Sequence, residues 1–192
     1  YLETIGIPYV GSRVLGAALG QDKVIMKQVM GAEGLPIVPY TWFYDSEYLL
    51  DKEKIVKEVK KLGYPVIVKP ATLGSSVGIT FVKDESRLDD AINEAMKYDT
   101  KVVIEKTVDN LLEVNCSVLG NYEYQQTSVI EEVISSEEFL TYQDKYIGKG
   151  KGGKSKGMVS ADRIIPARID KELEDEVKEL AKKTFKVLNL NG

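Results

Sequence analysis

Histidine is absent from this sequence of 192 residues, and cysteine occurs only once, as Cys116. Without histidine, the chain cannot build a Ser-His-Asp triad, a Cys-His pair or a histidine-ligated metal site from its own residues. A single cysteine excludes an intrachain disulfide, which fits a reducing cytoplasmic setting. Cys116 lies among alternating apolar residues, so we expect a small buried side chain rather than a nucleophile.

Long apolar runs and excess positive charge are also missing. No run approaches the roughly 20 residues that a membrane-spanning helix needs, and no signal-peptide pattern opens the sequence. The net charge is −4 and the pI is about 5.1, which argues against nucleic-acid binding because such binding needs a basic face. A small phosphorylated ligand stays compatible, since it needs only a local cluster of positive charge.

Hydrophobic periodicity predicts an α+β fold in which helices alternate with largely antiparallel strands. The expected helices span residues 22–30, with Asp22 as the N-cap, 52–62, ended by Gly63, 86–98, and the stretch capped by Asp170. The expected strands span residues 64–69, 79–83, 101–105, 111–120 and 123–134, with a further extended segment at 164–169. The sequence opens inside one element and closes where a strand would follow a helix, so we expect the middle of a longer protein.

Two stretches resemble phosphate-binding loops. The first, GKGKGGKS at residues 148–155, satisfies the P-loop pattern through Gly153, Lys154 and Ser155. That motif requires a buried strand before it and a helix after it, whereas its flanks here are polar and glycine-containing. We interpret the match as coincidental, which leaves a solvated loop or a cationic lid that closes over a polyphosphate.

The second stretch, VIVKPATLGSSVGIT at residues 66–80, joins two predicted strands of a hairpin through an unusually long loop. Its glycines permit close backbone approach, and consecutive amides from Gly74 to Val77 form a concave anion site in such loops. Lys69 adds a positive charge at the end of the first strand. A plain hairpin loop is the alternative, but it does not explain an inward-facing lysine directly before a proline.

Several motifs, in order along the chain, closely resemble the D-alanine–D-alanine ligases of the ATP-grasp superfamily. They include KPATLGSSVGI at residues 69–79, GIPYVGS at 6–12, the D-K-x-x-x-K pattern at 22–27, VIEKTVDNLLEVNCSVLGN at 103–121, FLTYQDKY at 139–146 and IIPARI at 164–169. The resemblance implies an ATP-grasp fold of two antiparallel-sheet lobes packed with helices and truncated at both ends. Residues 1–20 would be the tail of an N-terminal domain, 21–104 the first lobe, and 105–192 part of the second lobe, with a mobile active-site loop at about 139–162.

The resemblance also implies roles for individual residues. Ser75, Lys145 and Tyr146 would serve catalysis, with Lys145 near the γ-phosphate and Tyr146 paired to Ser75. The residues expected to hold ATP are Lys23, Lys69, Gly74, Ser75, Ser76, Val77, Glu105, Lys106, Val108, Glu113, Phe139 and Lys145. Among these, Glu105, Lys106, Val108 and Phe139 would lie at the adenine and Glu113 at the ribose.

The implied reaction joins two D-alanines through an acyl phosphate, for peptidoglycan precursors, with ATP and Mg²⁺. The metal ligands of the family fall downstream of Gly192, so no residue here is assigned to metal, and the resemblance allows a homodimer of the full-length protein. Three alternatives stay open: a D-alanine–D-serine ligase, a P-loop hydrolase that uses Lys154, and a non-catalytic nucleotide-binding module. Single residues also have structural alternatives, such as a solvated helix face for Lys23 and Lys27, or an edge-strand ion pair between Glu105 and Lys106.

Overall fold

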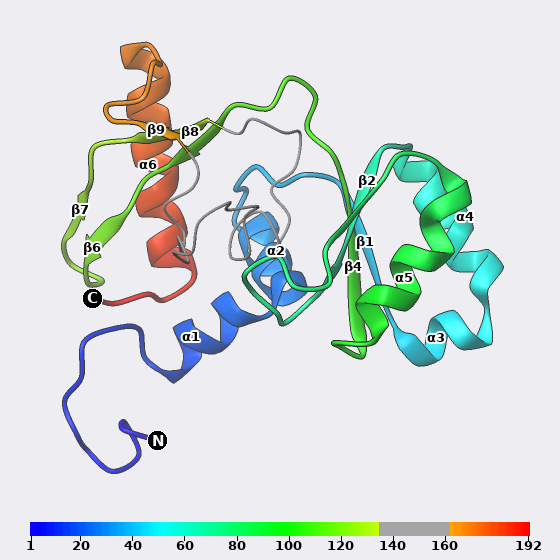
Figure 1. Cartoon of the computed structure of the whole chain (residues 1–192). Coiled ribbons are helices and arrows are strands. Elements are labelled where there is room, and N and C mark those ends of the chain that lie inside the picture. The colour runs from blue at the N-terminus through cyan, green and yellow to red at the C-terminus, as the bar shows by residue number, and fades with distance from the viewer. Residues whose placement is uncertain (135–161) are drawn as a thin grey trace, which may run out of the picture. The chain divides into compact units, whose positions relative to one another are not determined.

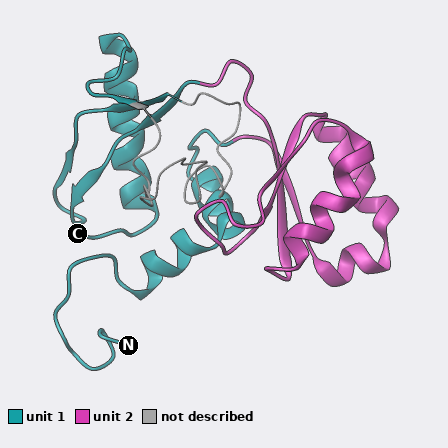
Figure 2. Cartoon of the chain, in the orientation of Figure 1, with its two compact units in different colours: residues 1–37, 112–134, 163–192 teal, residues 38–111, 135–162 magenta. Residues whose placement is uncertain are grey.

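A computed structural model of the chain (Figure 1) describes residues 1–134 and 162–192. The chain divides into two compact units (Figure 2). Unit 1 comprises residues 1–37, 112–134 and 163–192, and unit 2 comprises residues 38–111 together with the segment 135–162, of which only Asp162 is described. Helices and antiparallel strands occur in both units, so the predicted α+β class is confirmed.

Unit 2 is built on a sheet of four strands in the order β1-β4-β2-β3. These are β1 Tyr40–Tyr44, β4 Lys101–Lys106, β2 Val66–Pro70 and β3 Thr80–Val82. Every neighbouring pair is antiparallel, and β2 and β3 form the predicted hairpin, in which Val66 lies opposite Val82. We call the connection between them, residues 71–79, the glycine-rich loop.

Three helices cover one face of this sheet: α3 Asp45–Leu50, α4 Lys52–Leu62 and α5 Leu88–Met96, the last preceded by a 3-10 turn at Glu85–Arg87. Figure 1 shows them on the same side of β1, β2 and β4. The α4 helix has the predicted boundaries: Asp51 accepts the Lys54 amide proton at its start, and Gly63 ends it with φ of 76°. The short α3 helix was not predicted from the sequence.

The core of unit 2 lies between this helical layer and the sheet. Alternate strand residues point into this core. Along β2, buried residues therefore alternate with half-buried ones. The largest contributors are Phe43, Val66, Val68, Val82, Leu88, Ile92, Val102 and Ile104, all almost completely buried. Burying one such side chain stabilises a fold by about 1.5–3 kcal/mol, so this layer anchors β2 and β4, the strands that carry Lys69, Glu105 and Lys106.

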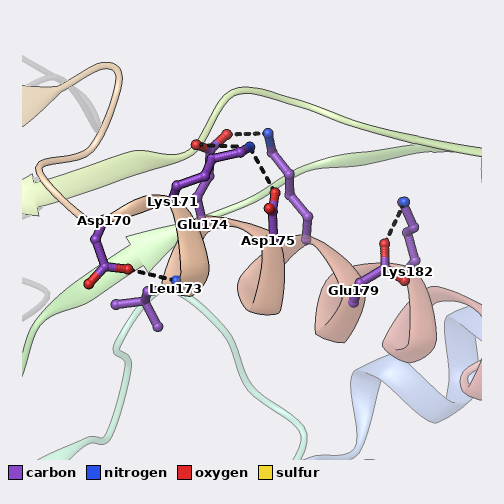
Figure 3. Close-up of polar contacts among 8 residues, drawn as sticks. Asp170, Lys171, Leu173, Glu174, Asp175, Glu179 and Lys182 are labelled. Carbon is purple, nitrogen blue, oxygen red and sulfur yellow. Dashed lines mark hydrogen bonds and ion pairs between the residues drawn. The ribbon is translucent and has the colours of Figure 1, made fainter.

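Unit 1 contains α1 Val14–Gln21, α2 Lys23–Ala32 and α6 Lys171–Val187. Asp22 caps α2, as predicted, by accepting the amide protons of Val24 and Ile25. Asp170 caps α6 in the same way, with its carboxylate 2.9 Å from the Leu173 nitrogen. Figure 3 shows this cap together with ion pairs along the helix, such as Lys182 with Glu179 at 2.8 Å.

The strands of unit 1 are shorter than the sequence predicts. The single strand expected over residues 111–120 is two, β5 Glu113–Asn115 and β6 Val118–Gly120, and the strand expected over 123–134 is also two, β7 Gln125–Thr127 and β8 Glu131–Ile134. β5 pairs with β8, while β6 pairs with β7 in a separate sheet. A short strand, β9 Asp162–Ile164, completes the sheet of β5 and β8.

The break between the two sheets has a visible cause. The pairing register changes by one residue between Asn115–Glu131 and Val118–Thr127, as in a β-bulge. At the change the Ser128 hydroxyl accepts the Ser117 amide proton at 3.0 Å, while the Ser128 amide donates to the Ser117 carbonyl at 2.9 Å. Cys116, expected to be buried, is only partly buried, and Leu112 is 50% exposed. The first residues, expected to lie inside a regular element, form turns at residues 2–6.

Among the described residues, no helix is both long enough and apolar enough to cross a membrane.

Candidate functional site

The face of the unit 2 sheet that lacks helices carries a charged pair. Lys69 on β2 donates a hydrogen bond from its ammonium to the Glu105 carboxylate on β4, and the two side chains are 19% and 9% exposed. Desolvating two charges is costly and is offset only by close pairing and further hydrogen bonds. An ammonium has three N–H donors, so the bond to Glu105 leaves this group able to bind an anion as well.

The strand register explains why these two residues meet. Residues directly opposite each other in neighbouring strands share a face. One rung across the sheet consists of Tyr40, Glu105, Ile67 and Phe81, and another consists of Trp42, Val103 and Lys69. The face therefore presents aromatic and aliphatic side chains around the Lys69–Glu105 pair, with the Lys101 ammonium 5.7 Å from the Trp42 ring centre. Such a surface suits a planar ring attached to an anionic group.

The glycine-rich loop begins two residues after Lys69 and has an unusual backbone. Ser75 and Ser76 both have positive φ, 55° and 60°, and Gly78 has 69°. Positive φ is uncommon for residues with a side chain and costs of order 1 kcal/mol each, so it persists where the surroundings impose it. Gly74 and Ser75 are exposed. The Val77 amide, one of the predicted phosphate donors, instead donates to the Gly74 carbonyl at 3.2 Å.

Lys106 and Val108 continue β4 beyond Glu105. The Lys106 ammonium donates to the carbonyl oxygens of Gly63 at 3.1 Å and Tyr64 at 2.8 Å, so its side chain serves the end of α4, where cations are favoured. A contact between Lys106 and a nucleotide would therefore use its main chain. The alternative of an edge-strand pair between Glu105 and Lys106 is wrong, because β4 is an inner strand and Glu105 pairs with Lys69. Val108 is 52% exposed.

Lys23 and Glu113 lie in unit 1. Lys23 is the first residue of α2 and is partly buried, at the helix end that attracts anions. Lys27, one turn later, is only 9% exposed, so the alternative of a solvated face is wrong for this residue. Glu113 begins β5 with its side chain exposed.

Within unit 2, the structure pairs Lys69 with Glu105 and places Gly74, Ser75, Ser76 and Val77 in the loop between β2 and β3. Phe139, Lys145, Tyr146 and the segment Gly153-Lys154-Ser155 lie outside the described residues. No group of three or more acidic, cysteine or histidine side chains that could hold a metal ion occurs in residues 1–134 and 162–192.

Asp99, between α5 and β4, was not singled out from the sequence. Its carboxylate accepts protons from both the backbone and the hydroxyl of Thr72, at the start of the glycine-rich loop, at 2.7 and 2.8 Å. The two residues are 27 positions apart, so no local pattern indicates that they meet.

The family and the relatives that this chain resembles in sequence all carry the same description. Residues 29–192 match the family described as D-ala D-ala ligase C-terminus. The D-alanine–D-alanine ligase of Thermoanaerobacter sp. (strain X514) is 44% identical over 191 residues, and that of Caldicellulosiruptor bescii is 41% identical over 192. Both alignments cover 100% of this chain and 50% of the relative, so the chain spans about half the length of these curated relatives.

Solved structures of ligases superpose on this chain as well. The VanG D-Ala:D-Ser ligase from Enterococcus faecalis superposes with a TM-score of 0.79 at 33% identity, over 98% of this chain and 51% of that one. The D-alanine–D-alanine ligase from Bacillus anthracis gives a TM-score of 0.76 at 28% identity, over 99% and 56%.

Proposed function

This chain belongs to the D-Ala–D-Ala ligase C-terminal family and has its ATP-grasp fold, and from that membership we propose that it is the ATP-binding part of a ligase that joins two D-alanines. The product would be the dipeptide used in peptidoglycan precursors. ATP and D-alanine are the proposed small-molecule partners. The single observation that supports the proposal best is the Lys69–Glu105 pair at the root of the glycine-rich loop, on the helix-free face of the sheet.

The proposed nucleotide lies on that face. The Lys69 ammonium contacts the phosphates while Glu105 holds it in place, and the main-chain amides of the glycine-rich loop cover them. Glu105 and the main chain of Lys106 and Val108 border the adenine. The remaining proposed contacts are Lys23 to the phosphates, Glu113 to the ribose hydroxyls, Phe139 to the adenine, Lys145 to the γ-phosphate and Tyr146 to Ser75.

The proposed reaction has two steps. A carboxylate oxygen of the first D-alanine attacks the γ-phosphorus of ATP and ADP leaves, which produces an acyl phosphate. The amine of the second D-alanine then attacks the acyl carbon, inorganic phosphate leaves, and the amine loses a proton as the peptide bond forms. Lysines and backbone amides suit such chemistry because they offset negative charge on the transferred phosphoryl group. Mg²⁺ is proposed to accompany ATP, and no described residue is assigned to bind it.

Replacing Lys69 tests this proposal. In Lys69→Gln the side-chain amide still donates to Glu105, so the buried carboxylate keeps a partner while the positive charge is removed. We expect the Kd for ATP, measured by calorimetry, to rise about tenfold or more, as for loss of one charged hydrogen bond. Lys61→Gln is the matched control, since Lys61 pairs with Glu58 at 2.6 Å on the exposed side of α4. Unchanged ATP affinity in a folded Lys69→Gln protein would contradict the proposal.

A D-alanine–D-serine ligase is the second candidate, and the VanG structure is the observation that favours it. The relatives named as D-alanine–D-alanine ligases are more similar in sequence, at 41–44% identity against 33%. Phosphate release by the full-length enzyme, assayed with D-alanine alone and with added D-serine, separates the two. Stimulation by D-serine beyond that by an equal amount of D-alanine would favour the second candidate.

A further inference from the structure

Both ends of the glycine-rich loop rest on the turn between α5 and β4. At the first end, the Ala71 amide donates to the Lys101 carbonyl at 2.9 Å, and Thr72 bonds twice to Asp99. At the second end, Gly78 lies against the Tyr98 ring: a Cβ added to Gly78 would come within 2.8 Å of that ring and 2.7 Å of Pro70. The loop is therefore clamped at its two roots, while its tip at Gly74 and Ser75 is exposed.

Asp99 is the polar centre of this clamp. One carboxylate oxygen accepts both Thr72 protons, at 2.7 and 2.8 Å, and the other accepts the Lys101 amide proton at 3.0 Å. Hydrogen bonds to an ionised acceptor are about twice as strong as those between neutral groups. Asparagine cannot reproduce the arrangement, because its NH₂ group would face either the Thr72 donors or the Lys101 amide proton. A carboxylate at this position thus couples the loop to the first residue of β4.

The loop needs such support because its backbone is strained. Two consecutive serines at positive φ persist only where neighbouring structure imposes the conformation. The hydrogen bonds within the loop are long, 3.2 Å from Val77 to Gly74 and 3.4 Å from Ile79 to Ser76. The bonds from Thr72 to Asp99 are shorter than these two and partly buried, so they restrain the first root of the loop more tightly than either internal bond restrains the tip.

We propose that Asp99 is a positioning residue for the nucleotide: through Thr72 it holds the glycine-rich loop in the strained conformation that binds the phosphates of ATP. Asp99 acts through the loop and does not touch the ligand. The assignment rests on the proposed function, because the loop is taken to cover a nucleotide. Preorganising a loop raises affinity by lowering the cost of ordering it during binding.

Two measurements on Asp99→Ala test the assignment. Hydrogen exchange in the protein without nucleotide should be about tenfold faster at the amides of Val77 and Ile79, which do not bond to Asp99 and therefore report on the loop itself. The Kd for ATP should rise about tenfold, the effect of losing a charged hydrogen-bond anchor. For Asp99→Asn, both the exchange rate at these amides and the Kd for ATP should lie between the values for wild type and for Asp99→Ala.

Asp84→Ala is the matched control. The Asp84 carboxylate also accepts a backbone and a hydroxyl proton from one residue, Ser86, at 3.0 and 2.5 Å, but at the opposite end of β3 from the loop. Its removal should leave loop exchange and ATP affinity unchanged. Thr72→Val is the second variant if Asp99→Ala fails to fold, because it removes only the hydroxyl bond. It should raise the exchange rate at the amides of Val77 and Ile79 by about threefold.

The outcomes separate the two proposals. If wild type binds ATP and the Asp99 and Thr72 variants change neither exchange at Val77 and Ile79 nor ATP affinity, the role of Asp99 is overturned while the proposed function stands. If wild type does not bind ATP, the proposed function fails, whatever the variants do to exchange.

Discussion

At the scale of single residues, the Glu132–Arg168 pair shows how a motif residue can serve structure rather than chemistry. Glu132 on β8 is 5% exposed. Its carboxylate accepts from the Arg168 guanidinium and from the Arg168 backbone amide at 3.0 Å. Arg168 belongs to the IIPARI segment, which resembles a ligase motif. The structure gives this arginine a fixed partner that holds the segment against β8, next to a backbone bond from Ala167 to Ile130.

The pair makes stability depend on pH in a defined window. Hydrogen bonds from the Arg168 side chain and backbone lower the pKa of Glu132 from 4.5 to about 2. Because the pKa of Glu132 is lower in the folded state than in the unfolded state, the pair stabilises the fold fully above about pH 4.5. This contribution is lost as the pH falls toward 2. We expect Glu132→Gln to be less stable than wild type in urea unfolding at pH 7, with the difference shrinking between pH 4.5 and 2.

Glu123→Gln, an exposed substitution in the same unit, is the control and should stay within about 0.5 kcal/mol of wild type. A stability difference between Glu132→Gln and wild type that stays constant from pH 7 to pH 2 would show that the Glu132 charge does not stabilise the fold.

At the scale of elements, α1 contains two glycines one turn apart in very different surroundings. A Cβ added to Gly16 would lie 2.5 Å from the Asn189 carbonyl oxygen, whereas one added to Gly20 meets nothing within 4 Å. Gly16 is buried, so it marks the contact through which α1 packs against the turn that follows α6. The glycine at position 16 is required by close backbone approach, and the glycine at position 20 is not.

This contrast predicts opposite effects for the same substitution. Gly20→Ala should stabilise the protein by about 0.5–1 kcal/mol, because alanine has the better helix propensity. Gly16→Ala should destabilise it by about 1–3 kcal/mol, since the helix must shift away from a backbone carbonyl. Urea unfolding of the two variants measures both values. Equal effects of the two substitutions would mean that α1 does not pack on residues 188–189.

At the scale of the whole molecule, the sequence predicted correctly those features that depend on neighbouring residues, such as the ends of helices. Asp22, Asp170 and Gly63 correctly delimit α2, α6 and α4, because caps act within one helical turn. The six-residue α3 was missed because it is too short for a periodic pattern and buries only Tyr48. The strands after residue 111 were predicted too long and unbroken, because the change of register at Ser117 and Ser128 depends on how residues 11 positions apart pair across the sheet.

In the candidate site too, the features set by one stretch of sequence were predicted, and those set by contacts between distant residues were not. Lys69 and the glycine-rich loop were identified from residue types in one continuous stretch. The pairing of Lys69 with Glu105 requires the register between β2 and β4, and the bond from Thr72 to Asp99 requires the position of the α5–β4 turn. Both depend on tertiary packing, for which the sequence contains no local signal.

The last prediction concerns which of two sequence stretches binds phosphate in this net-negative chain. The P-loop pattern at Gly153-Lys154-Ser155 lies outside the described residues, whereas Lys69 lies on a buried sheet. The sequence around Lys154 lacks the buried strand and the helix that a P-loop requires. Lys69 is only 19% exposed and is held by Glu105, and a charge interacts more strongly with a phosphate where water is partly excluded. Lys154→Gln should therefore change the Kd for ATP by less than about fivefold in calorimetry, and Lys69→Gln by tenfold or more. Binding abolished by Lys154→Gln but retained in Lys69→Gln would instead assign the phosphates to the P-loop pattern and favour a nucleotide hydrolase.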